Sequence, residues 1–321
     1  MPRGATSVAP SRPASRSAWT RWSPTPRGCH ASSRWRYRTA SDDRVRIKFW
    51  GTRGTRPTPG RRTLRYGGNT TCIEVRGSKE QLLILDSGSG IAELGASLAE
   101  DRSRDYHLLI SHTHWDHIQG FPFFGPAFVH GTRVTVVGPA GSIKSLQSAF
   151  ADQMDPAYFP LRLDQVPAEL EFIEVPAGQP LEMAGMTITP YELNHPIVTL
   201  GYRIQEGGRT FCFATDNELL PGDAVRPITD WCRGADLLVH DAQYSEGEYP
   251  SHAGWGHSTF DDALSLAEDA GVRQLAFFHH DPLHSDDEID ALVEEALGNH
   301  RQRRAGRVLA FPAAEDQEIV L

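Results

Sequence analysis

The sequence of residues 45–321 predicts an α/β fold in which two β-sheets pack face to face and helices cover their outer faces. Short segments rich in β-branched and aromatic residues recur along this part of the chain, and amphipathic helical patterns are interspersed with them. Such a mixture is typical of sheets that are buried between layers of helices. Residues 45–321 show no internal repeat and no linker, which favours a single domain.

The expected strands are short apolar runs bounded by turn residues. They are VRIKFW (45–50), TCIEV (71–75), LLILD (82–86), YHLLI (106–110), RVTVV (133–137), LEFIEV (170–175), MTITPYEL (186–193), LGYRI (200–204), TFCFATD (210–216), DLLVHD (236–241), LAFFHH (275–280) and RVLAF (307–311).

The expected helices are residues 142–154, 258–271 and 286–300. The second begins with a Ser-Thr pair followed by Asp and ends at Gly271, which are typical start and stop signals.

Residues 1–44 differ from the rest of the chain in composition. They contain nine arginines and two aspartates, and they lack helical or strand periodicity, so we expect them to be disordered. An organellar transit peptide, an electrostatic tether, or upstream sequence included by a mistaken start would each explain this segment. The remaining 23 basic and 39 acidic residues give residues 45–321 a net charge of −16, which argues against a broad nucleic-acid-binding face.

Composition also limits the compartment. No apolar run approaches the roughly 20 residues that cross a bilayer, and no signal-peptide pattern opens the chain, so we expect no membrane association. The four cysteines are far apart, without the paired spacing of a metal site, which is typical of buried thiols in a reducing compartment. We therefore expect a cytoplasmic protein.

One short segment concentrates metal-binding side chains. SHTHWDHIQG follows the apolar run YHLLI directly and places His112, His114, Asp116 and His117 within six residues. Residues that follow a buried strand lie at the rim of a sheet, where a rigid scaffold can hold ligands. This spacing can serve two adjacent metal ions, the first pair binding one ion and the second pair the other.

The pattern H-x-H-x-D-H resembles the signature of the metallo-β-lactamase superfamily, and the resemblance extends over residues 45–321. It implies a four-layer αββα sandwich and a metal-dependent hydrolase. It also implies three further ligands: His195 after one strand, the bridging Asp216 after another, and either His279 or His280. Because adjacent strand residues point to opposite faces, only one of these two can face the metals, and we choose His279.

The resemblance assigns further roles. Asp86, in the turn of LILDSGSG, is expected to orient the ligand loop from behind the ligands, although a plain turn residue is the alternative. The segments LLVHDAQYSEGEY and GWGHST resemble the phosphodiesterase branch, which includes ribonuclease Z and cyclic phosphodiesterases. They imply that Asp241 holds His257 in position to protonate a departing alkoxide, whereas the alternative role for His257 is that of a helix cap.

Two observations bear on the substrate. Bacterial ribonuclease Z enzymes carry a long tRNA-binding arm between the third histidine and the bridging aspartate, whereas His195 and Asp216 are too close in this sequence for such an arm. The loop 51–70 contains several arginines among glycines, of which Arg53 and Arg56 are candidates to contact a phosphate. Plain surface charge is the equal alternative for these arginines.

The sequence therefore predicts a binuclear hydrolase of a small cyclic or activated phosphodiester, with a 3′,5′-cyclic nucleotide as the leading candidate. The resemblance implies attack by a hydroxide that bridges the two divalent ions, with Asp116, Asp241 and His257 as catalytic residues. Zn²⁺ is the expected metal and Mn²⁺ the alternative. The other functions in view are a ribonuclease Z-type tRNA 3′-end endonuclease, a lactonase or thioesterase, and an inactive metal-binding protein. Nucleic acid is a less favoured partner than a small molecule, and the sequence allows a homodimer.

Overall fold

Two seven-stranded sheets form the centre of the structure, a computed structural model that describes residues 44–101, 103–220, 226–303 and 308–321. The predicted disorder of residues 1–44 and the domain boundary that follows them lie almost wholly outside the described residues. The first sheet has the order β14-β1-β2-β3-β4-β5-β6, and the second has the order β13-β12-β11-β10-β9-β8-β7.

The strands of the first sheet are β1 (Arg46–Gly51), β2 (Cys72–Arg76), β3 (Leu82–Leu85), β4 (Asp105–Leu109), β5 (Arg133–Pro139), β6 (Glu169–Val175) and β14 (Glu318–Val320). Those of the second are β7 (Leu181–Met183), β8 (Met186–Leu193), β9 (Thr199–Glu206), β10 (Arg209–Ala214), β11 (Leu237–Asp241), β12 (Gln274–Phe278) and β13 (Leu309–Pro312). In each sheet one half is parallel, β3 to β6 in the first and β10 to β13 in the second.

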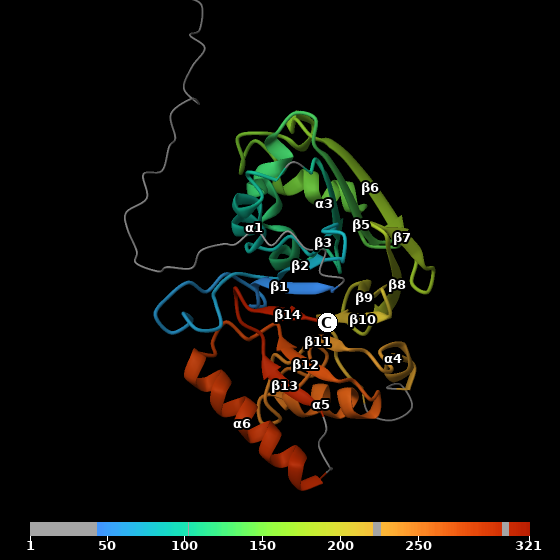
Figure 1. The fold of residues 1–321 in the computed structure, drawn as a ribbon. Coiled ribbons are helices and arrows are strands. Elements are labelled where there is room, and N and C mark those ends of the chain that lie inside the picture. The colour runs from blue at the N-terminus through green and yellow to red at the C-terminus, as the bar shows by residue number, and fades with distance from the viewer. Residues whose placement is uncertain (1–43, 102, 221–225, 304–307) are drawn as a thin grey trace, which may run out of the picture. The chain divides into compact units, whose positions relative to one another are not determined.

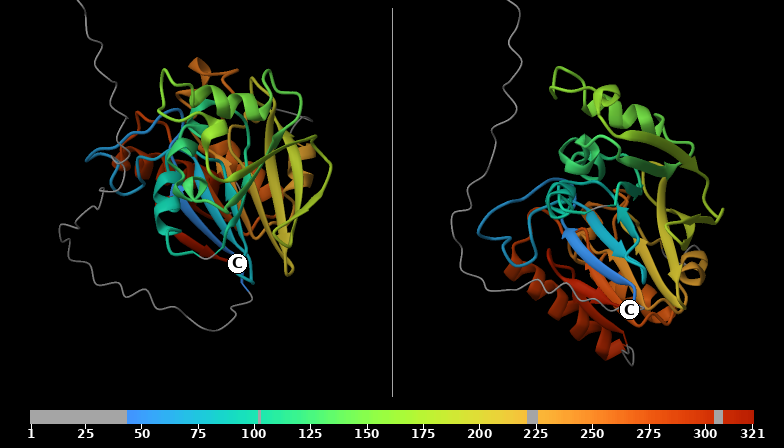
Figure 2. Two further views of the ribbon diagram at one scale, coloured as in Figure 1. Left: turned by 90° about the horizontal axis from the view of Figure 1, so that it is seen from above. Right: turned by 45° about the horizontal axis from the view of Figure 1, so that its top comes forward.

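Helices lie on the outer side of each sheet (Figure 1). The covering helices are α1 (Ile91–Ser97), α3 (Leu146–Gln153), α4 (Arg226–Trp231), α5 (Phe260–Asp269) and α6 (Asp286–Arg303). The short helix α2 (Trp115–Ile118) lies in the loop after β4. Figure 1 shows α1 and α3 on one side of the two sheets and α4, α5 and α6 on the other, and the right-hand view of Figure 2 shows the same order of layers. None of the helices within the described residues has the length and apolar character that a membrane span requires.

Alternation of buried side chains produces three apolar layers. On β3, Leu83 and Leu85 join the core between the sheets, whereas Ile84 packs into the core beneath α1 and α3. On β12, Phe278 lies in the core between the sheets and Phe277 in the core beneath α5 and α6. Because both faces of these strands are covered, β3 is apolar throughout and β12 is apolar after Gln274. The predicted αββα sandwich is confirmed.

Candidate metal centre

The loop after β4 carries the four clustered metal-binding residues. His114 is the N-cap of α2 with extended backbone angles, so His112 and His114 precede the helix while Asp116 and His117 fall in its first turn. His112 and His117 are fully buried, and Asp116 is buried, whereas His114 is exposed at the edge of the cluster. The Thr55 amide donates a hydrogen bond of 2.7 Å to Asp116 Oδ2 and holds that carboxylate from the opposite loop.

Asp86 anchors this loop from behind. It follows β3, is fully buried and has a φ of 57°. Its carboxylate accepts hydrogen bonds from the Ser111 amide at 2.7 Å and the Ser111 hydroxyl at 2.9 Å, and it lies 2.8 Å from His117 Nδ1. Burial raises the pKa of Asp86, while His117 and Ser111 oppose that shift. The contact with Nδ1 turns Nε2 of His117 toward the cluster, which is the orienting contact expected behind a metal ligand.

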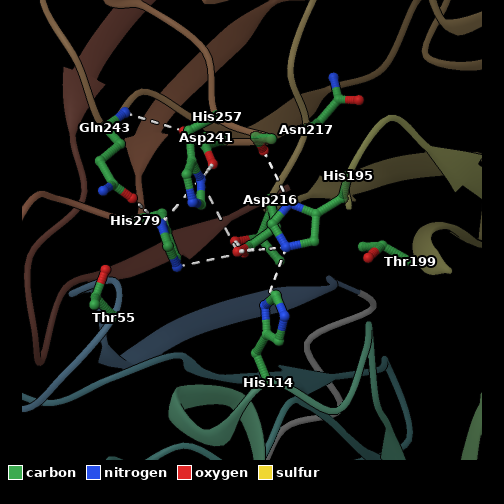
Figure 3. A network of polar contacts seen from close by, with 12 residues as sticks. Thr55, His114, His195, Thr199, Asp216, Asn217, Asp241, Gln243, His257 and His279 are labelled. Atoms are coloured by element: carbon green, nitrogen blue, oxygen red, sulfur yellow. Dashed lines mark hydrogen bonds and ion pairs between the residues drawn. The ribbon is translucent and has the colours of Figure 1, made fainter. Parts of the chain in front are cut away.

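Asp216 lies between two groups of histidines. Its Oδ1 is 3.8 Å from His112 Nε2 and 3.9 Å from His195 Nε2, whereas its Oδ2 is 3.2 Å from His117 Nε2 and 3.3 Å from His279 Nε2. Figure 3 shows this carboxylate at the centre of the network of polar contacts. Each oxygen therefore faces a different pair of histidines.

The chain reaches Asp216 through a short hairpin. His195 follows β8, and β9 and β10 pair antiparallel through a turn at Gly207 and Gly208 before Asp216 follows β10. His195 Nε2 lies 3.1 Å from His114 Nδ1, and its Nδ1 lies 3.1 Å from the carbonyl oxygen of Gly256. These contacts hold one ring nitrogen of His195 against the loop after β4 and the other against the segment before α5.

The late histidine in the cluster is His279. It follows the end of β12 with a φ of 60°, and its Nε2 lies 3.3 Å from Asp116 Oδ2. Its Nδ1 lies 2.8 Å from Gln243 Oε1. His280 is also buried, but its Nε2 donates to the carbonyl oxygen of Ala313 at 2.9 Å, away from the other ligands.

The donor atoms are of the kind that binds divalent cations. Four overlapping groups of ligand atoms within the described residues each lie within 4.8 Å of one another; two of the three-residue groups, called here the two ligand sets, share no member, and Asp216 lies between them. The sets are His112, His114 and His195, and Asp116, His117 and His279. Within the described chain, the Nε2 atoms of His112 and His117 are buried without a hydrogen bond. Buried polar atoms normally have partners, and a cation would provide them here. Burial also lowers the pKa of His112 well below its usual range, which favours the neutral imidazole that binds metals.

Comparison with known proteins identifies the family. A sequence model of the beta-lactamase superfamily domain matches residues 86–280, which include every residue of the cluster. The chain belongs to this superfamily. The match confirms the resemblance noted in the sequence, and the superfamily fold together with the cluster indicates divalent metal binding.

Relatives place the chain in the phosphodiesterase branch of the superfamily. It is 23% identical to a ribonuclease BN of Cronobacter sakazakii, over 86% of this chain and 99% of that protein. It is 30% identical to a ribonuclease Z of Exiguobacterium sibiricum, over 54% of this chain and 70% of that protein. The predicted class of metal-dependent hydrolase is thereby confirmed.

Solved structures share the fold. The metallo-β-lactamase fold protein YhfI from Bacillus subtilis superposes with a TM-score of 0.65 at 18% identity, covering 87% of this chain and all of that one. A diphosphatase of the PhnP family gives a TM-score of 0.62 at 16% identity, covering 86% of this chain and 97% of that one.

Beside the ligands of this superfamily member lies a buried carboxylate–imidazole pair. Asp241 ends β11, and its Oδ2 is 2.6 Å from His257 Nδ1. Burial alone would lower the pKa of His257, but Asp241 outweighs that effect and raises it to about 9. His257 Nδ1 also lies 3.9 Å from Asp216 Oδ1, so the imidazole borders the space between the two ligand sets. The helix cap before α5 is Thr259, whose side chain accepts from the amide of Asp262, and not His257.

Several residues that hold the site had no recognisable pattern in the sequence. Gln243 fixes His279, and its amide nitrogen donates to Asp281 Oδ2 at 3.2 Å and to the Tyr244 hydroxyl at 3.0 Å. Gly54 and Gly256 allow close approach, because a Cβ at Gly54 would overlap the ring of His279 and one at Gly256 would overlap the ring of His195. In the sequence Gly256 directly precedes the catalytic candidate His257, whereas Gly54 is flanked by Arg53 and Thr55 and has no such neighbour.

The prediction that Arg53 contacts a phosphate is wrong. Its side chain is fully buried, and its guanidinium donates to the carbonyl oxygens of Gly67, Asp281 and His284 at 2.7–3.0 Å. Arg53 therefore ties the loop after β1 to the loop after β12. Arg56 is exposed, and its contact with a phosphate stays a prediction.

Proposed function

We propose that the chain hydrolyses a small cyclic or activated phosphodiester with two divalent ions held in the two ligand sets. The observation that carries this proposal is the Asp241–His257 pair beside Asp216, whose two oxygens face different ligand sets. Bound Zn²⁺ or Mn²⁺ supplies charge that neutralises a phosphodiester and, from water, a nucleophile at neutral pH.

The residues of the chain would then bind the phosphate and supply a proton to the leaving group. His112, His114 and His195 form one side of the site, and Asp116, His117 and His279 form the other, so a phosphate centred over Asp216 meets both. The Nδ1 proton of His257 is donated to Asp241, so the proton available for transfer is on Nε2. We assign His257 to protonate the leaving alkoxide, and Asp241 to hold its tautomer and orientation.

The proposal of a small substrate rests on the connection between His195 and Asp216. The β9–β10 hairpin fills this interval, and its strands pair from Arg209 and Glu206 onward, so nothing in the interval projects as a separate arm. Binding energy must therefore come from groups near the scissile phosphate. The net charge of −16 on residues 45–321 also repels the backbone of a folded RNA.

A ribonuclease Z-type tRNA endonuclease is the second candidate, because relatives carry that name. One experiment separates the two. Metal-reconstituted protein is assayed side by side with a 3′,5′-cyclic nucleotide, a linear dinucleotide, precursor tRNA, a lactone and a thioester. We expect the highest kcat/KM for a small phosphodiester. Efficient tRNA processing with negligible turnover of small diesters would establish the second candidate instead, and preferred cleavage of the lactone or thioester would reject both.

A further inference from the structure

Two tryptophans beside the metal centre leave large parts of their rings in solvent. Trp115 is 69% exposed and Trp255 is 59% exposed, and they are the only exposed tryptophans within the described residues. Both are neighbours of the site in the chain, since Trp115 directly follows His114 and Trp255 lies two residues before His257. Single exposed apolar residues are common on protein surfaces. What distinguishes these two tryptophans is their position beside the metal centre.

A chain of polar contacts links the two positions. His114 Nδ1 lies 3.1 Å from His195 Nε2, and His195 Nδ1 lies 3.1 Å from the carbonyl oxygen of Gly256. Trp115 is joined to the first residue of this chain by one peptide bond, and Trp255 is joined to the last in the same way. Because consecutive Cα atoms are about 3.8 Å apart, both backbones border the exposed edge of the ligand set that contains His114. Figure 3 shows the rings of His114 and His195 next to each other, joined by a dashed line.

The backbone around Trp255 is held rigidly. The carboxylate of Glu218 accepts hydrogen bonds from the Gly254 amide at 2.8 Å and the Gly256 amide at 3.0 Å, one on each side of Trp255. The same carboxylate accepts the Tyr249 hydroxyl at 2.6 Å. Glu218 is itself buried and lies two residues after Asp216, so the loop is tied to the strand end that carries the shared carboxylate.

The ring of Trp255 packs on a series of aromatic side chains. It meets the ring of His252 edge to face at 4.9 Å, and His252 stacks on Tyr244 at 4.3 Å. Tyr244 in turn contacts the ring of His257 edge to face at 6.0 Å. The exposed indole of Trp255 is thus held by the carboxylate of Glu218, through the amides on either side, and by a series of aromatic contacts that ends at the ring of His257. Nothing in the core requires this arrangement, because the indole is largely outside it.

We propose that Trp115 and Trp255 stack on a flat aromatic ring of the substrate, so that the phosphodiester is one that carries a nucleobase. This inference rests on the proposed function and narrows its substrate class. Every base has a π-face, and stacking on aromatic side chains is the main sequence-tolerant means of binding bases. The position also suits the size argument, because a base attached to the ribose of a cyclic phosphate lies within a few ångströms of the scissile bond.

The test compares two substrates that differ only in the base. Metal-loaded protein is assayed with adenosine 3′,5′-cyclic phosphate and with the 3′,5′-cyclic phosphate of methyl riboside, which lacks a base. The quantity of interest is the ratio of the two kcat/KM values. We expect the wild-type ratio to favour the nucleotide and to fall about fivefold or more in Trp255→Ala and in Trp115→Ala. Phenylalanine at either position should retain most of the ratio, because it keeps a stacking face.

Three controls give each outcome a meaning. Metal content is measured for every variant, and if Trp115→Ala loses metal, Trp255→Ala decides alone. Leu309→Ala removes a 62%-exposed apolar side chain at the start of β13, the end opposite the metal centre, and should leave the ratio unchanged. Sedimentation velocity is run on all variants. An unchanged ratio in a metal-replete Trp255→Ala variant overturns the inference, and a change confined to oligomeric state would assign these rings to a protein interface instead.

Failure of the proposed function would be seen separately. If metal-loaded wild-type protein hydrolyses neither cyclic phosphate, the phosphodiesterase assignment is wrong for these substrates. In that case the affinities of the protein for the same two compounds are measured by calorimetry. The ratio of the two affinities, in the wild type and in the tryptophan variants, then takes the place of the ratio of kcat/KM values. Equal affinities, or no binding of either compound, would overturn it.

Discussion

Replacement of His257 by alanine separates proton transfer from metal binding. The imidazole contacts Asp241 at 2.6 Å, and it also lies with Asp216, Asp241 and His279 in a group whose ligand atoms are within 4.8 Å of one another. Two roles are therefore compatible with its position, a general acid and a metal ligand. They differ in what the substitution removes: the first predicts a metal-replete but slow enzyme, and the second predicts loss of an ion.

The structure allows the magnitude to be estimated. After the substitution, Asp241 still accepts the Gln243 amide at 3.0 Å and the Ser258 amide at 3.3 Å, so its carboxylate keeps two donors. We expect the domain to fold, with a free energy of unfolding lower by roughly 3 kcal/mol because a buried ion pair is broken. A positioned general acid contributes about 10² to 10⁴ in rate, so kcat should fall about a hundredfold or more for a diester with an alkoxide leaving group.

The assay uses two leaving groups. A cyclic nucleotide must expel an alkoxide, whereas a 4-nitrophenyl diester expels an anion that is stable at neutral pH and needs little protonation. We expect His257→Ala to lose less than about tenfold on the second substrate. His130→Ala is the matched control, since His130 is an exposed histidine in the loop before β5. Full activity on the cyclic nucleotide, or loss of a metal ion on substitution, would refute the assignment of His257 as the acid.

The remaining predictions concern the metals, their supports and the N-terminal segment. Reconstituted protein should contain about two divalent ions per chain and lose activity with a chelator, and His114→Ala should lose metal; a clean stoichiometry of one would remove the binuclear mechanism. Gln243→Ala should weaken metal affinity about 10- to 100-fold in chelator competition, because His279 loses the partner of its Nδ1; equal affinity would show that this contact is dispensable. Gly256→Ala should displace His195 and reduce metal content, whereas Gly254→Ala, with a similar φ of 85° but open space around a Cβ, should keep both ions; identical metal content in the two variants would contradict the steric argument. Deletion of residues 1–44 should leave the circular dichroism spectrum and kcat unchanged, since the segment lacks the apolar pattern needed to join a core, and a loss of activity at constant metal content would show that it belongs to the working domain.

Local spacing explains why so much of the site was predictable. The four residues from His112 to His117 are brought together by one loop, and the strand before them is apolar enough to be recognised from the sequence. Strands that are buried on both faces were also predictable, because each is a continuous apolar run in the sequence. By contrast, β14 has three residues, and it is held by pairing with β1 at the other end of the chain. No local pattern records such a contact.

The ring of His279, and not that of His280, points toward Asp216, but strand alternation is not the cause. β12 ends at Phe278, and the left-handed φ of His279 turns its ring toward Asp216. Backbone angles of this kind are rare outside glycine and are not visible in residue type. The prediction for Arg53 was wrong for a related reason. The sequence of a glycine-rich loop does not indicate whether an arginine in it faces a ligand or, as here, three carbonyl oxygens of the chain.

Strained backbone gathers at this centre. Thr55, Asp86, Asp216 and His279 all have φ values between 54° and 62°, and each contributes a ligand or a direct contact to one. Conformations of this kind cost on the order of 1–3 kcal/mol each and persist only where the surrounding structure enforces them. Here the enforcing structure is the pair of sheets, since the strands before Asp86, Asp216 and His279 are buried on both faces and fix the points where these residues begin. Within the described residues, the carboxylates and imidazoles contact one another, but the Nε2 atoms of His112 and His117 stay buried without a hydrogen bond. The fold therefore presents a strained set of candidate ligands in which two buried ring nitrogens lack a hydrogen bond, and a bound cation would give those nitrogens partners.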